Sequence, residues 1–357
     1  MSVNFIIGTK AQFIKCIPVI NEFIQKDISI RLYDLKQHGK ITKALREKIL
    51  GKFEYIEYSK NIEDIGTYLE LIKWFVITVI KIIFFTEKKI RSSYVFIHGD
   101  TLSTILGMLL AKRNGSILVL LEAGHSVPGI LKHFPESVIR YICAKKADYL
   151  IATGESQLDQ LKKWHVKGKI VEISRNTIYD SVSRISLQMK SSNDIIVSIH
   201  RTENINNRKI MTLLVETLCD LSKKFNVIWF LHKPTRNKLK SYNLINKINQ
   251  NGIETHELQG YEIFINKMYN SKFVITDGGG VVEECKIIGI PTLVWRNEHI
   301  DQNEIFQNSR NLVLSNYDIE EINYFVANYK DYGVNFELEN IASPSKEIVR
   351  EFVKIIN

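Results

Sequence analysis

Short apolar runs alternate along the chain with stretches of helical periodicity. In the first half the apolar runs are VNFIIGT (3–9), SYVFIHGD (93–100), ILVLLEAG (117–124) and ADYLIATG (147–154). Helical patterns follow two of them, AQFIKCIPVINEFIQ (11–25) and TLSTILGMLLAKRNG (101–115). Nearly continuous apolar strands that alternate with helices are typical of a parallel sheet buried on both faces. The pattern therefore predicts a doubly wound α/β fold.

A polar stretch, SLQMKSSND (186–194), interrupts this rhythm, and a second series of apolar runs follows it. These runs are IIVSIH (195–200), NVIWFLHKP (226–234), KFVITDGGG (272–280), IPTLVW (290–295) and NLVLS (311–315). A chain of 357 residues also exceeds the usual size of a single core. We therefore expect two Rossmann-like domains, residues 1–183 and 184–340, that face each other across a cleft. A C-terminal helix at 341–357 is expected to pack back on the first domain.

Polar motifs occur mainly where the predicted strands end. They are Gly8-Thr9, His98-Gly99-Asp100, Glu122-Ala123-Gly124, His200-Arg201, His232-Lys233 and Asp277 to Gly280. Ligands of open parallel sheets bind beyond the carboxyl ends of the strands. The coincidence predicts a single site in the cleft between the two domains.

Composition narrows the class of partner. The formal charge is +9 and the pI is near 9.1, which suits nucleic acid, an anionic membrane surface or a phosphorylated small molecule. The sequence has no zinc-finger spacing and no aromatic RNA-binding strand, so a nucleic-acid partner is not expected. Four widely separated cysteines and an N-terminus without a basic leader predict free thiols in the cytoplasm.

The segment from Leu71 to Phe85, LIKWFVITVIKIIFF, is apolar except for Lys73, Thr78 and Lys81. It is too short for a relaxed membrane span. Two interpretations stay open, a buried helix and a helix that rests on the inner face of a membrane.

The run TDGGGVVEE (276–284) joins a strand end to three glycines and two acids. The glycines would let a ligand approach the backbone, and a helix that starts near Val281 would offer unpaired N–H groups to a diphosphate. Glu283 and Glu284, one turn later, would accept hydrogen bonds from ribose hydroxyls. The alternative is a simple glycine corner, because the spacing is not the G-x-G-x-x-G of a nicotinamide site.

Three carboxylates are candidates for proton chemistry. Asp100 and Glu122 follow successive predicted strands, and Glu136 belongs to the motif FPESVIR. Carboxylates that gather in one cleft repel each other, so we expect at least one raised pKa among them. Such a group can remove a proton from carbon and return it. Each acid taken singly is better explained by a structural role, such as a helix cap, and only the set of three favours catalysis.

Basic residues and histidines follow strands of the second domain. His200 and Arg201 leave a predicted strand directly into the cleft, where an imidazole and a guanidinium suit phosphate oxygens. His232, Lys233 and Arg236 form a second basic cluster, which a solvated loop explains equally well. The nine histidines show no HxH or HExxH spacing, so no metal site is predicted.

Taken together, the motifs occur in a recognisable order. They are GTKAQFIKCIPVI, HGDTLST, LEAGHS, FPESVIR, RNTIYDS, HRTEN, LHKP and DGGGVVEECKIIGIPTLVWR. This order resembles the non-hydrolysing UDP-N-acetylglucosamine 2-epimerase family, which has the B-type glycosyltransferase fold. The resemblance extends from about Phe5 to Ser315.

The resemblance implies an isomerase that interconverts UDP-GlcNAc and UDP-ManNAc, or a related UDP-sugar, by eliminating UDP and adding it back, for surface polysaccharide synthesis. It places Asp100, Glu122 and Glu136 at the C2 proton and His200 near the departing diphosphate. The residues it assigns to substrate binding are Lys10, Arg140, Arg201, His232, Gly278, Gly279, Gly280 and Glu284. It implies no metal or nicotinamide cofactor, and it suggests a homodimer.

The sequence departs from the family pattern mainly around the nucleotide. Gly278 follows Asp277 where the family usually has serine, Ile199 precedes His200 where it has glycine, and Lys10 replaces an arginine in the first turn. Three alternatives to this epimerase stay open. They are a hydrolysing epimerase, a membrane-associated glycosyltransferase with a lipid-linked acceptor, and a catalytically silent binding protein.

Overall fold

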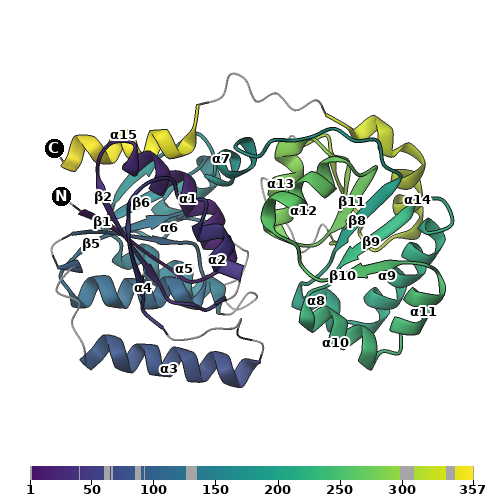
Figure 1. The fold of residues 1–357 in the computed structure, drawn as a ribbon, viewed down its shortest axis with the longest axis horizontal. Helices are drawn as coiled ribbons and strands as arrows, with labels where there is room; N and C mark the ends of the chain where they lie inside the picture. Colours follow the sequence, from purple (N-terminus) through teal and green to yellow (C-terminus); the bar gives the residue numbers. More distant parts are fainter. Residues whose placement is uncertain are drawn as a thin grey trace. The chain divides into compact units, whose positions relative to one another are not determined.

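The computed structural model describes residues 2–39, 41–59, 65, 67–84, 90–91, 93–125, 135–297, 309–334 and 342–356. The chain divides into two compact units. Unit 1 comprises Met1–Ser181 with Asn340–Asn357, and unit 2 comprises Val182–Glu339. In each unit a parallel sheet carries helices on both faces (Figure 1).

The sheet of unit 1 has the strand order β3-β2-β1-β4-β5-β6-β7 in the described residues, and every pairing is parallel. The strands are β1 (Ser2–Ile7), β2 (Ser29–Asp34), β3 (Glu54–Glu57), β4 (Tyr94–His98), β5 (Ile117–Leu121), β6 (Tyr149–Ala152) and β7 (Lys169–Glu172). The order reverses between β1 and β4, which pair through Val3 and Tyr94. Open α/β sheets bind their ligands at such a switch point, beyond the carboxyl ends of the strands.

The helices described in unit 1 are α1 (Lys10–Ile24), α2 (Ile41–Arg46), α3 (Tyr68–Phe84), α4 (Leu102–Arg113), α5 (Glu136–Lys146), α6 (Glu155–Lys163), α7 (Ile178–Ser183, at the boundary of the units) and α15 (Pro344–Ile356). Thr9 caps α1 by accepting the amide of Gln12, whose side chain accepts the Thr9 amide in return. This capping box satisfies two backbone donors at the helix start. Most of α1 is buried, so even its polar residues Gln12 and Lys15 face the interior of unit 1.

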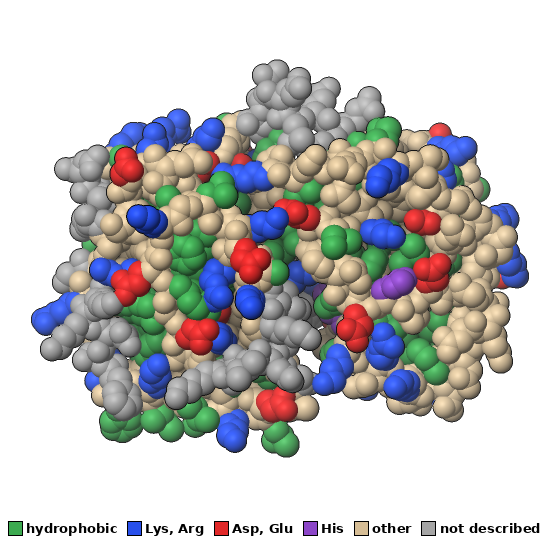
Figure 2. Space-filling view, in the orientation of Figure 1, with side chains coloured by type: hydrophobic (Ala, Val, Ile, Leu, Met, Phe, Trp, Pro, Cys, Tyr) green, Lys and Arg blue, Asp and Glu red, His purple; other side chains and the backbone are tan. Residues whose placement is uncertain are grey.

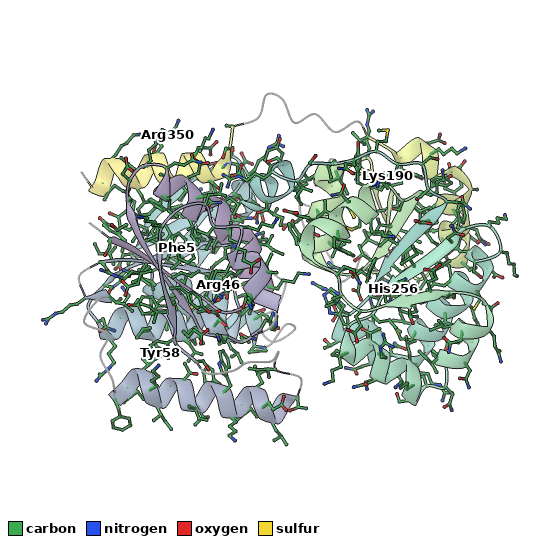
Figure 3. All side chains as sticks on the ribbon, viewed as in Figure 1. Phe5, Arg46, Tyr58, Lys190, His256 and Arg350 are labelled. Carbon is green, nitrogen blue, oxygen red and sulfur yellow. The ribbon has the colours of Figure 1, made fainter. Side chains whose placement is uncertain are left out.

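Aromatic side chains join α15 to the first sheet. Phe352 is fully buried, and its ring meets Phe96 at 5.0 Å and Tyr149 at 5.3 Å, edge to face in both cases. Phe96 also stacks on Phe5 at 5.0 Å, near the centre of the unit in Figure 3. Edge-to-face and offset pairs are the arrangements that the ring quadrupoles favour. The last helix of the chain therefore completes the core of the first unit.

The apolar segment from Leu71 to Phe84 forms most of α3, which packs on α4 at the outer edge of unit 1 (Figure 1). On its inner face the Trp74 indole donates to the carbonyl of Leu35 at 2.9 Å. Its outer face is exposed, so the helix is buried on one side only. Phe85, the end of the predicted segment, lies outside the described residues. Across the described part of the chain, each helix is too short or too polar to cross a bilayer.

Unit 2 has the parallel strand order β10-β9-β8-β11-β12-β13 in the described residues. The strands are β8 (Asp194–Ser198), β9 (Asn226–Phe230), β10 (Glu254–His256), β11 (Phe273–Thr276), β12 (Thr292–Val294) and β13 (Leu312–Leu314). The helices are α8 (Thr202–Ile205), α9 (Arg208–Leu221), α10 (Lys233–Ser241), α11 (Ile245–Gln250), α12 (Tyr261–Tyr269), α13 (Gly279–Ile288), α14 (Ile319–Asn328) and the 3₁₀ turn η2 (Tyr329–Tyr332).

The α/β fold predicted from the apolar runs is confirmed, and each quoted run contains a strand. One boundary was wrong. Helix α13 begins at Gly279 with Gly278 as its N-cap, rather than near Val281. The amides of a first helical turn have no partner within the helix, whichever residues it contains, so glycines are tolerated there. The amides of Gly279 and Gly280 therefore belong to the first turn of this helix, and the amide of Gly278 donates to Thr276 Oγ1 at 3.2 Å.

Candidate active site

The ends of β4 and β5 bring two predicted acids to neighbouring positions. The strands pair in parallel with His98 opposite Leu121, so Asp100 and Glu122 leave the same edge of the sheet. Glu122 has a φ of 59°, in the left-handed region. Holding a non-glycine residue there costs on the order of 1–2 kcal/mol, and strain of this kind gathers at functional sites.

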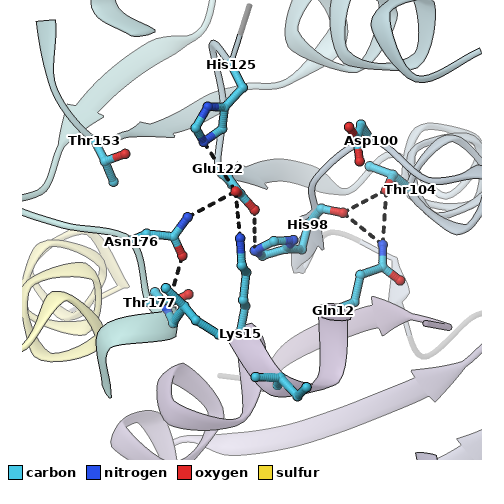
Figure 4. Close-up of polar contacts among 12 residues, drawn as sticks. Gln12, Lys15, His98, Asp100, Thr104, Glu122, His125, Thr153, Asn176 and Thr177 are labelled. Atoms are coloured by element: carbon cyan, nitrogen blue, oxygen red, sulfur yellow. Dashed lines mark hydrogen bonds and ion pairs between the residues drawn. The ribbon is translucent and has the colours of Figure 1, made fainter. Parts of the chain in front are cut away.

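The Glu122 carboxylate is the centre of a polar cluster (Figure 4). Its Oε1 accepts from Lys15 Nζ at 2.7 Å and from Asn176 Nδ2 at 3.0 Å, and it lies 3.2 Å from His125 Nε2. Its Oε2 lies 3.1 Å from His98 Nε2. We call these five residues the Glu122 cluster. The side chain of Glu122 is 15% exposed and that of Lys15 is 10% exposed, so the charges attract each other with little screening by water.

The electrostatics of the cluster keep Glu122 ionised. Burial by itself raises the pKa of this carboxyl, but Lys15, His98 and His125 together outweigh burial and hold the pKa well below its usual range. Among the three candidate acids, Glu122 is therefore not one with a raised pKa. The reason is that its nearest charged neighbour is an ammonium group and not a second carboxylate.

His98 belongs to the cluster as a neutral imidazole. Burial is the main reason that its pKa falls to about 4, and the smaller effect of Glu122 opposes that fall. Since Nε2 faces the carboxylate, the geometry assigns the ring proton to Nε2, which donates to Glu122. The backbone of His98 is also fixed, because its carbonyl accepts from Gln12 Nε2 at 2.8 Å and from Thr104 Oγ1 at 2.7 Å.

A small pocket lies beside the cluster within unit 1. It is lined by His98, Leu121, Glu122, Ile151, Thr153, Ile173, Asn176, Thr177 and Ile348. The cluster therefore borders a small cavity within unit 1.

Asp100 is joined to α5 by an ion pair. Arg140 Nη2 lies 2.5 Å from Asp100 Oδ2, and the two side chains are 25% and 22% exposed. Glu136 is the exposed first residue of α5, four residues before Arg140 and on the same side of the helix. The structure thus connects Asp100 to the helix that carries Glu136. It records no contact between Glu136 and the Glu122 cluster among the described residues.

The first turn of unit 1 comes close to α4. A Cβ on Gly8 would lie 2.6 Å from Ser103 Oγ, so only glycine fits there without a shift. Lys10, the predicted substrate contact of this turn, is the half-buried first residue of α1. Its backbone amide donates to His38 Nδ1 at 3.1 Å.

In unit 2, Asp277 organises the strand ends. It is fully buried, and its Oδ1 accepts the amide of His200 at 2.9 Å. Its Oδ2 accepts the amide of Arg201 at 3.0 Å and Asn204 Nδ2 at 2.9 Å. Arg296 Nε donates to the Asp277 carbonyl at 2.8 Å. Because both carboxylate oxygens are engaged in this way, Asp277 positions the residues after β8.

His200 and His232 leave the adjacent strands β8 and β9 and stack at 4.4 Å between ring centroids. Burial lowers the pKa of His200, and Asp277 opposes that shift. A Cβ on Gly278 would come 2.5 Å from His200 Cε1, so the imidazole occupies the space over this glycine. Glycine in place of the family's usual serine therefore matches the way His200 packs.

Two guanidinium groups lie near the start of α13. Arg201 pairs with Glu203 at 2.9 Å. Burial is the main reason that the pKa of Arg296 falls to about 10, and repulsion by Arg201 is the next. A Cβ on Gly280 would meet nothing within 4 Å, and one on Gly279 would meet only Arg296, at 3.9 Å. Two cations beside a helix N-terminus with open glycines form a suitable site for phosphate.

Glu284 is more buried than Gly279 and Gly280. It is 6% exposed. Burial and then Glu284 raise the pKa of Tyr261 well above its usual range, which places the carboxylate beside this phenol. The residue expected to meet ribose hydroxyls is therefore a buried acceptor next to a tyrosine.

Sequence reasoning missed Lys15 and Asn176, and it gave no role to His98, His125 or Arg296. Lys15 lies within the helical pattern predicted at 11–25, to which no chemistry was assigned. The available signal was the position of a lysine between Ile14 and Cys16 on a buried helix, since buried ammonium groups need a partner. Asn176 lies in a quoted motif, RNTIYDS, but nothing in its spacing reveals that it meets Glu122.

Comparisons with known proteins agree on one family. A family model described as UDP-N-acetylglucosamine 2-epimerase matches residues 26–343. The UDP-N-acetylglucosamine 2-epimerase of Methanococcus maripaludis is 26% identical over 90% of this chain and 89% of its own length. The protein of the same description from Methanocaldococcus jannaschii is 25% identical over 83% of this chain and 84% of its own length.

A solved structure shares the fold. It is the UDP-GlcNAc 2-epimerase of Methanocaldococcus jannaschii in complex with UDP-GlcNAc and UDP, and it matches with a TM-score of 0.80 at 22% identity. The match covers 99% of this chain and 100% of that one. The two-unit α/β architecture is thus the B-type glycosyltransferase fold of these enzymes.

Proposed function

The chain belongs to the UDP-N-acetylglucosamine 2-epimerase family, and we propose that it interconverts UDP-GlcNAc and UDP-ManNAc, or inverts C2 of a related UDP-sugar. The enzyme is an isomerase, and its product would supply surface polysaccharide synthesis. The observation that carries the proposal is the Glu122 cluster. It is a strained, buried carboxylate held ionised at a strand end, beside the strand end that carries Asp100.

The proposed reaction has two steps. In the first, a carboxylate removes the C2 proton while the bond from C1 to the UDP oxygen breaks. The products are 2-acetamidoglucal, with a double bond between C1 and C2, and UDP. In the second step a proton is delivered to the opposite face of C2, and the UDP oxygen bonds to C1 again. Because carbon is neither oxidised nor reduced overall, the reaction as written needs no redox cofactor.

We assign the proton chemistry to the acids of unit 1. Asp100 and Glu136 are more accessible than Glu122, so they are suited to exchange a proton with the sugar. Glu122 is suited to remain a carboxylate and to stabilise positive charge that develops at C1 as the leaving group departs. Arg140 fixes the direction of the Asp100 carboxylate.

We assign the UDP group to residues of unit 2. The diphosphate would accept hydrogen bonds from the first amides of α13 and from Arg201, with Arg296 as a buried positive charge. His200 would donate to the departing phosphate, with His232 as its stacking partner. Glu284 would accept hydrogen bonds from the ribose, and Lys10 of unit 1 would add a further positive charge for the substrate.

The test is proton NMR of UDP-GlcNAc with the purified protein in D₂O. We expect UDP-ManNAc to form and both epimers to carry deuterium at C2. Accumulation of UDP with free ManNAc would instead identify a hydrolysing epimerase. Absence of both deuterium and the second epimer would contradict the proposal.

The assignment of the acids is tested separately by Asp100→Asn and Glu136→Gln. Each variant keeps the size of the side chain but cannot take a proton, so deuterium incorporation should fall by about 100-fold or more. Asp159→Asn is the matched control, because Asp159 is an exposed acid of unit 1 that pairs only with Lys162 in the described contacts. Normal turnover in the double variant Asp100→Asn, Glu136→Gln would refute the assignment.

We further propose a cytoplasmic location, in keeping with four buried free thiols among the described residues. A lipid-linked acceptor is not part of this proposal, because family membership does not favour a transferase. We also propose that the chain acts as a homodimer. A peripheral membrane contact through residues 71–85 is a separate proposal, supported by the exposed apolar side chains that the structure describes between Ile72 and Phe84.

A further inference from the structure

Residues 174–180 are held at both ends by the last helix of the chain. We call them the crossing segment, because the chain passes into unit 2 directly after them. At the start of the segment, the Glu347 carboxylate of α15 accepts from the backbone amide and from the hydroxyl of Ser174, each at 2.7 Å. At its end, Asp180 accepts the backbone amide of Ser345 at 2.7 Å. Figure 4 shows α15, in yellow, beside the part of the segment that carries Asn176.

The two holds differ in their exposure to water. Asp180 is buried and accepts an amide in the first turn of α15, where a carboxylate satisfies a donor that has no partner within the helix. Glu347 is half-buried and Ser174 is exposed. A substitution of Asp180 therefore endangers the fold, whereas Glu347 can be changed while unit 1 stays folded.

Asn176 lies between the two holds and reaches the Glu122 cluster. Its Nδ2 donates to Glu122 Oε1 at 3.0 Å, and its Oδ1 accepts the amide of Ile178 at 3.1 Å. Because the side-chain oxygen is engaged by a backbone donor, the NH₂ group is the end that faces the carboxylate. The position of this donor therefore depends on the backbone of the crossing segment.

Helix α15 has one face toward the site and another toward solvent. Ile348, the residue after Glu347, is fully buried and lines the same pocket as Glu122. Lys346 and Arg350 are exposed, and Figure 2 shows basic side chains along the edge of unit 1 where α15 lies. Glu347 thus stands where the buried face of the helix meets the solvated one.

We propose that Glu347 is a positioning residue of the epimerase site. By holding Ser174, it keeps Asn176 in the place from which it donates to Glu122. The inference rests on the proposed function, in which the Glu122 carboxylate stabilises the charge that develops at C1. Glu347 acts only through the crossing segment. When that segment shifts, Glu122 keeps Lys15 as a partner but loses the second donor to Oε1, so its charge is no longer held in one direction.

The first test is steady-state kinetics of the full-length protein with UDP-GlcNAc. Glu347→Ala should lower kcat by about tenfold and leave KM nearly unchanged, because the charge of Glu122 acts in the transition state. Ser174→Ala loses one of the two hydrogen bonds, so kcat should fall by only about two- to threefold. Glu351→Ala is the matched control, since Glu351 lies one turn further along α15 and pairs with Lys354. Equal kcat values in Glu347→Ala and the wild type would overturn the proposal.

A double-mutant cycle separates positioning from a general loosening of unit 1. If Glu347 acts through Asn176, then Glu347→Ala should cause no further loss of kcat in an Asn176→Ala background. If α15 served only to stabilise the fold, the two substitutions would lower kcat independently. A double variant whose loss equals the product of the two single losses would therefore overturn the proposal.

The same cycle measured by urea denaturation does not depend on the reaction. The fall in the urea midpoint caused by Glu347→Ala should be smaller in the Asn176→Ala background than in the wild type, because the two residues hold the same segment. A wild type without turnover of UDP-GlcNAc would contradict the proposed function and leave this cycle as the test of the hold. Additive falls in the urea midpoint would overturn the hold itself.

Discussion

At the scale of single residues, the main feature of unit 1 is an ionised carboxylate that is held in place from several sides. Glu122 has strained backbone dihedrals and a buried side chain, and it is compensated by an ammonium group, an amide and two imidazoles. Removing one partner leaves a charge without compensation. Substitutions in this cluster should therefore affect stability, and their effects should depend on pH in predictable directions.

We predict that Lys15→Met destabilises unit 1 by about 3 kcal/mol at pH 7, since breaking a buried ion pair leaves the other charge unpaired. The pKa of Glu122 is depressed in the folded protein, so its stabilising contribution is present above the unfolded value and is lost as the pH falls through the folded value. Without Lys15 the Glu122 carboxyl protonates more readily as the pH is lowered. The loss of unfolding free energy caused by Lys15→Met should therefore be smaller at pH 4.5 than at pH 7. Urea denaturation at both pH values measures this.

Lys162→Met provides the control for Lys15→Met. Lys162 pairs with Asp159 at the surface, where the side chains are 71% and 62% exposed, so its loss should cost less than about 1 kcal/mol at either pH. Equal effects of the two substitutions would show that the Glu122 cluster does not stabilise the fold.

We predict that His98→Gln alters the pH dependence of stability between pH 6.5 and 4. The folded pKa of His98 is about 4, below its usual 6.5, so in this range the unfolded state binds a proton that the folded state lacks. The free energy of unfolding of the wild type should therefore decrease as the pH is lowered. This residue should account for up to about 3 kcal/mol of the decrease near pH 4. Glutamine keeps a neutral donor for Glu122 and cannot titrate. If the free energy of unfolding changed with pH in the same way in the wild type and in His98→Gln, His98 would not be the neutral buried imidazole assigned here.

At the scale of elements, the strand–turn–helix from β11 to α13 shows how a short motif reaches a specific geometry. Sequence alone predicted the strand, the glycine turn and the following helix, because apolar runs and glycines report local preferences. It did not reveal that Gly278 makes room for the His200 ring, because the two residues are brought together from different strands.

We predict that Gly278→Ala destabilises unit 2 by about 1–3 kcal/mol, because the new Cβ would overlap His200 Cε1 and force the ring or the turn to move. The backbone of Gly278, with φ of −77°, suits any residue, so the effect would be steric. Gly280→Ala is the matched control in the same turn. It meets nothing within 4 Å and should be neutral or stabilising by up to about 1 kcal/mol. Thermal unfolding distinguishes the two.

At the scale of the whole molecule, the chain crosses from unit 1 to unit 2 and returns at its end. Helix α15 belongs to unit 1, although unit 2 separates it in sequence from the rest of that unit. Its ring contacts with β4 and β6 mean that the core of unit 1 cannot be completed before the last residues of the chain are available.

We predict that Phe352→Ala destabilises unit 1 by about 3–5 kcal/mol through the cavity it leaves against Phe96 and Tyr149. Unit 2 has its own core and should keep its stability. Hydrogen exchange followed by mass spectrometry should show faster exchange in β4 and β6 and unchanged exchange in β8 and β11. Arg350→Ala, on an exposed side chain of the same helix, is the control and should change neither unit.

The sequence by itself determined the alternation of strands and helices, the break between two series, and the strand ends at which polar residues gather. Local periodicity suffices for these features, because each residue's burial follows from its place in one strand or helix. Short edge strands such as β3, which is only partly buried, gave too weak a pattern to be noticed.

Only the tertiary structure decided which side chains meet. Lys15 reaches Glu122 across 107 positions of sequence, and that ion pair lowers the pKa of a carboxyl that burial alone would raise. A charge–charge interaction depends on distance in space, and spacing along the chain does not contain that distance.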